Sequence, residues 1–207
     1  MTVEPFWEDA YRASARDPFG AASSEVLEVL DWLPVGSCVL DLGCGMGRNA
    51  VPLARAGMSV TCVDVSEAAC ARLNSDAAEL VESGHLSVVH CDMGEFVPAD
   101  DFYLVIAHGT LHLLEPCDRR QLMYRMKGWT KPGGSNIVAV FTNRLPTPLD
   151  MRDQFVGLFD EGELAASYDD WEIVLCQAYT LEDEHPGGIT HAHPVNKIVA
   201  RRPLSTG

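Results

Sequence analysis

The sequence predicts an α/β fold: a doubly wound, mainly parallel sheet of seven strands that ends in an antiparallel hairpin. Short apolar runs alternate with segments of helical periodicity, glycines follow the first apolar run, and the last two runs lie close together. Alternation of strands and helices is typical of βαβ units, which build parallel sheets. We expect one domain over 1–207, with an N-terminal helical lid at 1–33 and the sheet-forming core at 34–207.

The individual elements follow from apolar periodicity and from the residues that begin and end helices. We expect strands at 37–42, 59–63, 86–91, 101–107, 136–141, 171–179 and 194–201. We expect helices at 24–32, 48–56, 66–81, 115–129 and 161–167, after an amphipathic segment broken at Pro18 and Gly20. Ser66 is placed to cap the helix at 66–81, and Gly57 follows the helix at 48–56 where a left-handed residue ends helices. The sequence Lys-Pro-Gly-Gly at 131–134 is expected to close the helix before it.

The end of the chain departs from the alternating pattern. Only 14 residues, 180–193, separate the last two expected strands, and they include Pro186, Gly187 and Gly188. A parallel crossover needs a dozen or more residues, usually in a helix, and this segment has no helical pattern. We therefore expect the last two strands to form an antiparallel hairpin at the edge of the sheet.

Composition and charge disfavour several classes of function. The chain has 15 Lys and Arg against 30 Asp and Glu, a formal net charge of −15, which opposes binding to nucleic acids and anionic membranes. No segment reaches the ~18 apolar residues of a membrane span, and the first residues lack the apolar stretch of a signal peptide. The seven cysteines form no Cys-x-x-Cys pair and lie mostly in apolar runs, which favours buried thiols in a reducing compartment. We expect a cytoplasmic protein, either a monomer or a homodimer.

The most informative segment is the glycine loop Gly43-x-Gly45-x-Gly47, which joins an expected strand to an expected helix. Such a loop lies at the carboxyl end of the first strand, where doubly wound sheets bind ligands, and its glycines let the backbone approach a ligand closely. The spacing differs from the dinucleotide pattern G-x-G-x-x-G, whose third glycine would fall on Arg48. Asp41 adds negative charge before the loop, which favours a cationic or amine-bearing ligand over a phosphate.

Two more acids follow the next strands of the expected sheet. Asp64 ends the second strand, where a carboxylate can accept hydrogen bonds from ribose hydroxyls. Asp92 follows the third strand and could accept from the exocyclic amine of a base. Asp64 could instead cap the helix that begins near Ser66, and Asp92 could be an ordinary surface acid. Taken with the glycine loop, the two acids predict a site for a nucleoside without phosphates.

These residues carry a family resemblance, because the segment VLDLGCGMGRN at 39–49 resembles motif I of the class I S-adenosylmethionine-dependent methyltransferases. The resemblance covers nearly the whole chain and implies a Rossmann-like sheet, with S-adenosyl-L-methionine as cofactor and S-adenosyl-L-homocysteine as product. It places ribose and adenine contacts at Asp64 and Cys91–Met93, and the methionine part of the cofactor near His108. The cofactor-binding residues that it implies are Asp41, Gly43, Cys44, Gly45, Arg48, Asn49, Asp64, Val65, Asp92, Met93 and His108.

Segments outside the glycine loop narrow the resemblance. GCGMGRNAVPLARAG, TKPGGSNIVAV, EGELAASYDDWEIV and the final VARR are similar to the bacterial tellurite-resistance methyltransferase family. Between the last two strands that family is rich in arginine, which suits an oxyanion, whereas this chain has EDEHPGGITHAHPVNK. The resemblance thus implies the methyl donor, and it leaves a small-molecule acceptor open among a chalcogen, a thiol and a hydroxyl.

Three histidines replace the arginines of that segment, His185, His191 and His193. Their side chains could bind or deprotonate the acceptor, could be packed or surface residues without a role, or could hold a metal, although no Asp or Cys partner accompanies the His-x-His spacing. We predict the first role, with His185 and His191 as catalytic residues, His193 as an acceptor contact and no metal. A hydroxyl acceptor would need such a base near neutral pH, whereas a thiol or reduced chalcogen needs little help.

The remaining candidates flank the expected pocket. His112 lies beyond the fourth strand and is predicted to contact the acceptor, or else it lines a helix. Trp7 and Tyr11 lie one helical turn apart in the lid, and they are predicted to contact the acceptor or else to pack in the core. Arg48 holds the cofactor or a substrate carboxylate, or forms a surface salt bridge. Two other functions stay open: a non-catalytic S-adenosylmethionine sensor, and a nicotinamide-dependent dehydrogenase, which the displaced third glycine disfavours.

Overall fold

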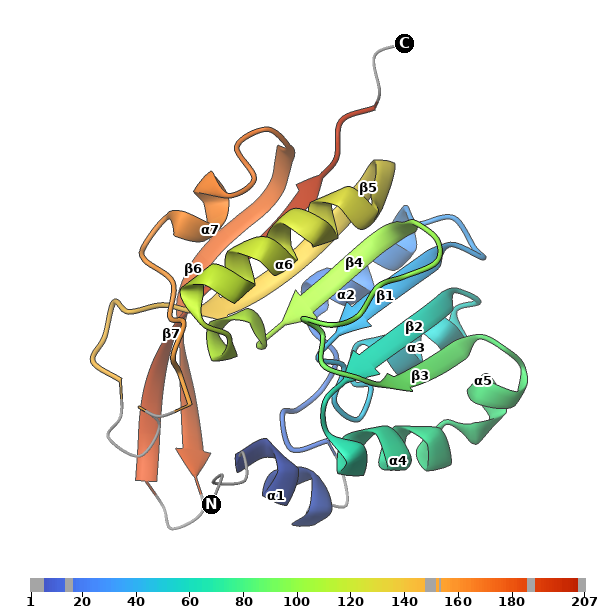
Figure 1. Cartoon of the computed structure of the whole chain (residues 1–207), viewed down its shortest axis with the longest axis horizontal. Coiled ribbons are helices and arrows are strands. Elements are labelled where there is room, and N and C mark those ends of the chain that lie inside the picture. The colour runs from blue at the N-terminus through green and yellow to red at the C-terminus, as the bar shows by residue number, and fades with distance from the viewer. Residues whose placement is uncertain (1–5, 14–16, 148–151, 153, 186–188, 205–207) are drawn as a thin grey trace. The chain divides into compact units, whose positions relative to one another are not determined.

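The structure, a computed structural model, describes residues 6–13, 17–147, 152, 154–185 and 189–204, without the side chains of residue 6 and of 183–190. It divides into two compact units, Met1–Ile106 and Ala107–Gly207. Seven strands form one sheet in the order β3-β2-β1-β4-β5-β7-β6 (Figure 1). The strands are β1 (Cys38–Leu42), β2 (Ser59–Asp64), β3 (Leu86–His90), β4 (Phe102–His108), β5 (Thr130–Phe141), β6 (Glu172–His185) and β7 (Ile189–Arg201).

The predicted fold class is confirmed, including the hairpin at the sheet edge. β1 pairs with β2, and β2 with β3, in parallel, whereas β7 pairs antiparallel with both β5 and β6. The chain therefore ends in a hairpin of two long strands, as the short connection between them predicts. No helix among the described residues is both long enough and apolar enough to cross a membrane.

The first unit brings the tips of its strands to one edge. Asp41 of β1 is in register with Cys62 of β2, so Gly43, which follows β1, and Asp64, which ends β2, lie at the same edge. The strand interiors are buried apolar residues, such as Val39, Leu40 and Val60. Its helices are α1 (Phe6–Ala13), α2 (Ser24–Glu28), the 3₁₀ turn Val29–Asp31, α3 (Ala50–Arg55), α4 (Glu67–Asp76) and α5 (Ala78–Glu82). Ser66 caps α4 as predicted, because its hydroxyl accepts from the Ala69 N–H at 3.0 Å.

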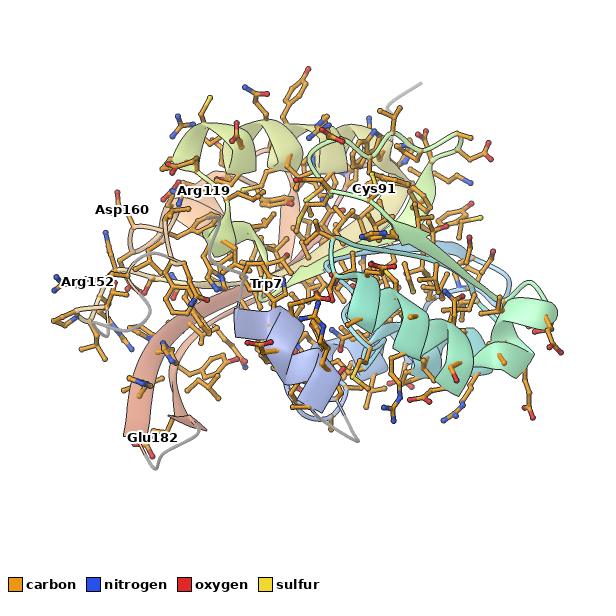
Figure 2. All side chains as sticks on the ribbon, turned by 60° about the horizontal axis from the view of Figure 1, so that its bottom comes forward. Trp7, Cys91, Arg119, Arg152, Asp160 and Glu182 are labelled. Carbon is orange, nitrogen blue, oxygen red and sulfur yellow. The ribbon has the colours of Figure 1, made fainter. Side chains whose placement is uncertain are left out.

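The second unit is built around β5, β7 and the helices that pack on them. These helices are the 3₁₀ turn Leu111–Leu113, α6 (Pro116–Trp129) and α7 (Glu163–Ala166) (Figure 1). Arg119 of α6 is buried and donates two hydrogen bonds to Glu163 at 2.6 and 2.8 Å, while its guanidinium lies 4.0 Å from the Phe159 ring centroid (Figure 2). This ion pair fixes the segment between β5 and α7 against α6.

Several boundaries differ from the predictions. The helix expected at 66–81 is interrupted at Ala77 (ψ 29°), after Asn74, Ser75 and Asp76, whose side chains compete with helical hydrogen bonds. β5 begins at Thr130 and not at 136, because Gly133 and Gly134 form backbone hydrogen bonds with the Arg202 peptide beyond β7. β6 and β7 also extend well beyond the expected ends, so that only 186–188 separate them.

The expectation of buried cysteines holds for only part of the set. Cys44, Cys62 and Cys70 are buried, and a side-chain hydrogen bond with Cys62, together with burial, raises the pKa of Cys44. Cys38 and Cys91 are half-buried, whereas Cys117 and Cys176 are exposed. The exposed thiols lie in α6 and in the edge strand β6, where the sequence pattern gave no sign of exposure.

Candidate functional site

The glycine loop of the first unit folds as a tight turn from β1 into α3. Gly43, Gly45 and Gly47 have φ angles of 69°, 56° and 83°, in the left-handed region that favours glycine. The N–H groups of Gly43 and Cys44 both donate to the Val63 carbonyl, at 2.7 and 3.2 Å. The loop is therefore held at the tip of β2.

Asp64 joins the two strand tips through its carboxylate. One oxygen accepts from the Gly45 N–H at 2.7 Å, and the other accepts from the Ser66 N–H at 2.8 Å. The side chain is buried, and burial raises its pKa in spite of these hydrogen bonds. The carboxylate thus joins the glycine loop to the start of the segment that leads into α4, and its predicted ribose contact stays a prediction.

Asp41 is the most deeply buried acid of the loop, with only 2% of its surface exposed. Its Oδ2 atom has no hydrogen-bond partner among the described residues. Burial raises its pKa to about 7, Arg48 opposes this shift, and the charges of Asp64 and Asp17 add to it. A buried carboxylate oxygen without a donor is expected to gain from a cationic or N–H-bearing ligand.

Helix α1 brings an aromatic side chain onto the loop. Glu8 anchors the helix, because its carboxylate accepts from the Ala68 N–H of α4 at 3.3 Å and from Arg12 at 3.2 Å. Tyr11 is buried, and its hydroxyl lies so close to Gly45 that a Cβ at position 45 would collide with it. Burial and the charges of Asp64 and Asp17 raise the pKa of Tyr11, so the hydroxyl stays protonated and can donate. Trp7, also on α1, is half-buried.

Arg48 and Asn49 hold the segment before α2 against the loop. Arg48 donates to the Ala21 carbonyl and to the Ser23 hydroxyl, each at 3.1 Å. Asn49 is buried and accepts from the Ser23 N–H at 3.0 Å. These two bonds go to neutral oxygens, and the predicted role of Arg48 in cofactor binding stays a prediction.

The third strand tip carries the residues predicted to contact adenine. Asp92 is exposed and accepts from the Gly94 N–H at 2.6 Å, and the Cys91 N–H donates to the Asp64 carbonyl at 2.9 Å. Met93 is half-buried, and Val65 is 49% exposed, which leaves an apolar surface at this tip. The structure thus gathers the predicted residues of strands β1, β2 and β3 in one unit.

The second unit contains the other predicted residues, around a group of rings that we call the aromatic–histidine cluster: His112, Phe141, Phe155 and His193. Phe141 is stacked between the two histidines, with centroids 4.3 Å from His112 and 4.8 Å from His193. Phe155 meets all three rings edge-on. The Phe141 N–H donates to His112 Nδ1 at 3.3 Å, which leaves the proton of the neutral ring on Nε2.

His112 is fully enclosed, and this determines its chemistry. Burial, together with the nearby His193, Arg119 and His108, lowers the pKa of His112 to about 3. The ring is therefore neutral at physiological pH and can donate a hydrogen bond, but it is unsuited to accept a proton. His193 and His191 are buried with ring centroids 5.9 Å apart, and the His185 side chain lies outside the described residues.

Sequence reasoning missed several residues that shape both regions. Phe141 and Phe155 form the walls of the aromatic–histidine cluster, and Glu8 anchors α1. Phe141 could have been found as the aromatic residue at the tip of an expected strand, but Phe155 and Glu8 lie in segments without a diagnostic pattern. Among the described residues no group of three or more His, Cys, Asp or Glu side chains is arranged to hold a metal ion.

The strand order, the glycine loop at the tip of β1 and the acid at the tip of β2 are those of a class I methyltransferase domain. In agreement, residues 39–134 match the family model described as "Methyltransferase domain". The chain is 31% identical over 138 residues to the probable S-adenosyl-L-methionine-dependent methyltransferase TehB of Haemophilus influenzae. The aligned residues cover 66% of this chain and 46% of that relative. It is also 32% identical over 153 residues to Hemagglutinin 1 of Eikenella corrodens, and this alignment covers 74% of this chain and 47% of that protein.

Solved structures agree on the fold. The crystal structure of TehB from Haemophilus influenzae has a TM-score of 0.77 at 24% identity, covering 95% of this chain and 66% of that one. N-methyltransferase NodS from Bradyrhizobium japonicum, in complex with S-adenosyl-L-homocysteine, has a TM-score of 0.68 at 17% identity, covering 95% and 96%. The resemblance predicted from the sequence, to class I S-adenosylmethionine-dependent methyltransferases and to the tellurite-resistance family, is confirmed. The chain spans about half the length of the two curated relatives named above.

Proposed function

We propose that this chain is an S-adenosyl-L-methionine-dependent methyltransferase that acts on a small-molecule acceptor with a chalcogen, thiol or hydroxyl nucleophile. The observation that carries the proposal is the bond between Asp64 and the Gly45 N–H, which places a buried carboxylate in a left-handed glycine loop. This arrangement suits a ribose beside the loop, and the glycine spacing differs from that of the dinucleotide type, whose third glycine falls on Arg48. The TehB and NodS relatives support the same chemistry.

The residues of the loop fit the cofactor chemically. The buried Oδ2 of Asp41 would accept from the ammonium group of the methionine part, and Asp64 would accept from the ribose hydroxyls. Asp92 would accept from the adenine amine, beside the apolar surface of Val65 and Met93. S-Adenosyl-L-methionine supplies a sulfonium whose methyl group is already activated, so the chain mainly has to position two reactants. An acidic loop is the setting that a cation without phosphates needs.

The second unit supplies the candidates for the acceptor. His112 would donate from Nε2 without changing charge, and His193 would add ring surface. Trp7, half-buried on α1 of the first unit, is a separate candidate. His185 and His191 are the proposed bases, needed only where the acceptor is a hydroxyl. A thiol or a reduced chalcogen reacts without such a base, and the Arabidopsis thaliana relative, at 27% identity, is named a probable thiol methyltransferase.

Formation of S-adenosyl-L-homocysteine tests the proposal. The chain is incubated with S-adenosyl-L-methionine and thiols, selenite, tellurite or small phenols, and product is measured for the wild type and for Asp64→Asn. We expect turnover with at least one acceptor and an affinity for S-adenosyl-L-homocysteine about 100-fold lower in Asp64→Asn, since the amide loses the negative charge and keeps only one accepting oxygen. Asp76→Asn, which removes an acid from the surface ion pair with Arg72, is the matched control. Binding without turnover for any acceptor would indicate a sensor, and no binding at high micromolar ligand would reject the site.

A further inference from the structure

The glycine loop uses its backbone donors within the chain. The N–H groups of Gly43, Cys44 and Gly47 donate to backbone carbonyls, at distances of 2.7–3.2 Å. The Gly45 N–H donates to the Asp64 carboxylate at 2.7 Å. In dinucleotide-binding loops such N–H groups bind a pyrophosphate. Since these donors are already satisfied here, they have little left to offer an anionic ligand group.

Asp17, which precedes the loop by more than one element, takes a further donor. The backbone N–H of Arg48, the residue at the third-glycine position of the dinucleotide pattern, donates to the Asp17 carboxylate. This carboxylate also accepts from the Phe19 N–H at 2.9 Å. Asp17 is half-buried, and burial raises its pKa, although the two N–H donors and the Arg48 charge oppose this shift. A carboxylate of the chain therefore occupies the N–H group that an anionic ligand would otherwise use.

The segment 17–23, which carries this acid, is fixed on the loop by contacts at its other residues. The Arg48 guanidinium donates to the Ser23 hydroxyl at 3.1 Å. The Phe19 ring meets the Tyr11 ring edge-on, with the centroids 5.5 Å apart. The position of the carboxylate is therefore set by its own hydrogen bonds and by the packing of the residues that follow it.

Asp17 adds to the negative potential that Asp41 and Asp64 create at the loop. Its charge raises the pKa of Asp41 and of Tyr11, and the charge of Asp64 acts on the same two groups in the same direction. Arg48 lowers both pKa values, but it is one cation against three carboxyl groups. The loop should therefore attract a cationic ligand group and repel an anionic one.

We propose that Asp17 is a specificity-determining residue of the cofactor site, which fills the backbone position that a phosphate would need and whose charge favours a sulfonium. This inference rests on the proposed methyltransferase function and extends it, because specificity is a difference of affinities that repulsion can create as well as attraction. S-Adenosyl-L-methionine has one positive charge more than S-adenosyl-L-homocysteine, whereas 5′-AMP carries a phosphate on the same adenosine. Removal of the Asp17 charge should therefore change the three affinities by different factors.

Calorimetry with these three ligands at pH 8, on the wild type and on Asp17→Asn, tests the proposal. The amide keeps an oxygen that can accept from the N–H groups of Phe19 and Arg48, so the substitution removes the charge and preserves the shape. Relative to S-adenosyl-L-homocysteine, we expect the affinity for S-adenosyl-L-methionine to fall about 3- to 10-fold and the affinity for 5′-AMP to rise by a similar factor. Asp76→Asn, in the surface ion pair with Arg72, is the matched control and should change neither ratio.

The ratios separate a role in specificity from a role in folding. An equal loss of all three affinities in Asp17→Asn would mean that the acid only supports the segment 17–23, and it would overturn the proposal. Unchanged ratios would overturn it too. Asp17→Glu retains the charge and should keep the wild-type ratios, so a shift as large as that of Asp17→Asn would also contradict the proposal. If the wild type bound neither sulfur ligand, the proposed function would be rejected and this inference with it, whereas wild-type binding with unchanged ratios in Asp17→Asn would reject this inference alone.

Discussion

The glycine loop of the first unit and the aromatic–histidine cluster of the second unit both bury titratable side chains whose pKa is shifted toward the uncharged form, but with opposite chemistry. In the loop the pKa of Asp41 is raised to about 7, whereas in the cluster the pKa of His112 is lowered to about 3. The loop is made by backbone geometry, with left-handed glycines and N–H groups bound to Asp64. The cluster is made by side-chain packing of rings. A site formed by backbone geometry can be recognised from a sequence motif, whereas a site formed by side-chain packing has almost no recognisable motif.

After Asp64→Asn, the largest effect is expected from adding one carbon to the loop. In Gly45→Ala the new Cβ collides with the Tyr11 hydroxyl, and the residue must hold a φ of 56°, a conformation that costs about 1–2 kcal/mol. We expect the affinity for S-adenosyl-L-homocysteine to fall at least ~10-fold in calorimetry. Tyr11→Phe in the same variant removes the hydroxyl and should restore part of the loss. Wild-type affinity in Gly45→Ala would show that the loop does not approach the ligand.

The next effect is a pH dependence of the loop. A carboxyl whose folded pKa exceeds its unfolded value binds more protons when folded, so Asp41 makes the protein less stable as the pH rises from about 4 to about 7. Asp41→Asn mimics the protonated form. We expect its unfolding free energy to exceed that of the wild type at pH 8, by on the order of 1–4 kcal/mol, and the difference to shrink toward pH 4. Urea titrations at both pH values measure this, and a variant less stable at pH 8 would contradict it.

The aromatic–histidine cluster should show the reverse dependence. A histidine whose folded pKa lies below its unfolded value binds fewer protons when folded, so His112 makes the protein less stable as the pH falls from about 6.5 toward 3. His112→Phe keeps a ring but leaves the Phe141 N–H without its acceptor, at a cost of about 1–2 kcal/mol at pH 8. We expect the difference in unfolding free energy between His112→Phe and the wild type to become smaller below pH 6.5. A gap independent of pH in urea titrations would mean that His112 titrates normally.

The smallest effect is expected at the cap of α4. Ser66→Ala removes the hydroxyl that accepts from the Ala69 N–H, which should lower the unfolding free energy by about 1 kcal/mol at any pH. Since Asp64 accepts from the backbone N–H of residue 66, its position should survive the substitution. Ligand affinity should therefore stay near the wild-type value, and a large loss would show that the cap also orders the loop.

These contrasts explain what the sequence could predict. The strands at the glycine loop, the cap at Ser66 and the antiparallel hairpin were predictable, because apolar runs, glycine spacing and a short connection each specify local geometry. The early start of β5 was not predictable, because it depends on hydrogen bonds between Gly133 and Arg202, which are distant in sequence.

The candidate site divides in the same way. Asp41 and Asp64 are at strand ends that the motif identifies, whereas Phe155 contacts His112 and His193 from a connecting segment that shows no period. The exposure of β6 was hidden as well, because an apolar run of strand length looks the same at the centre of a sheet and at its edge.

The most direct test of the central claim compares two ligands on the wild-type chain by calorimetry. The glycine loop with Asp64 is expected to bind S-adenosyl-L-homocysteine in the micromolar range and to show no heat with NADH, whose pyrophosphate the loop is not built to hold. Binding of NADH in place of S-adenosyl-L-homocysteine would contradict the account.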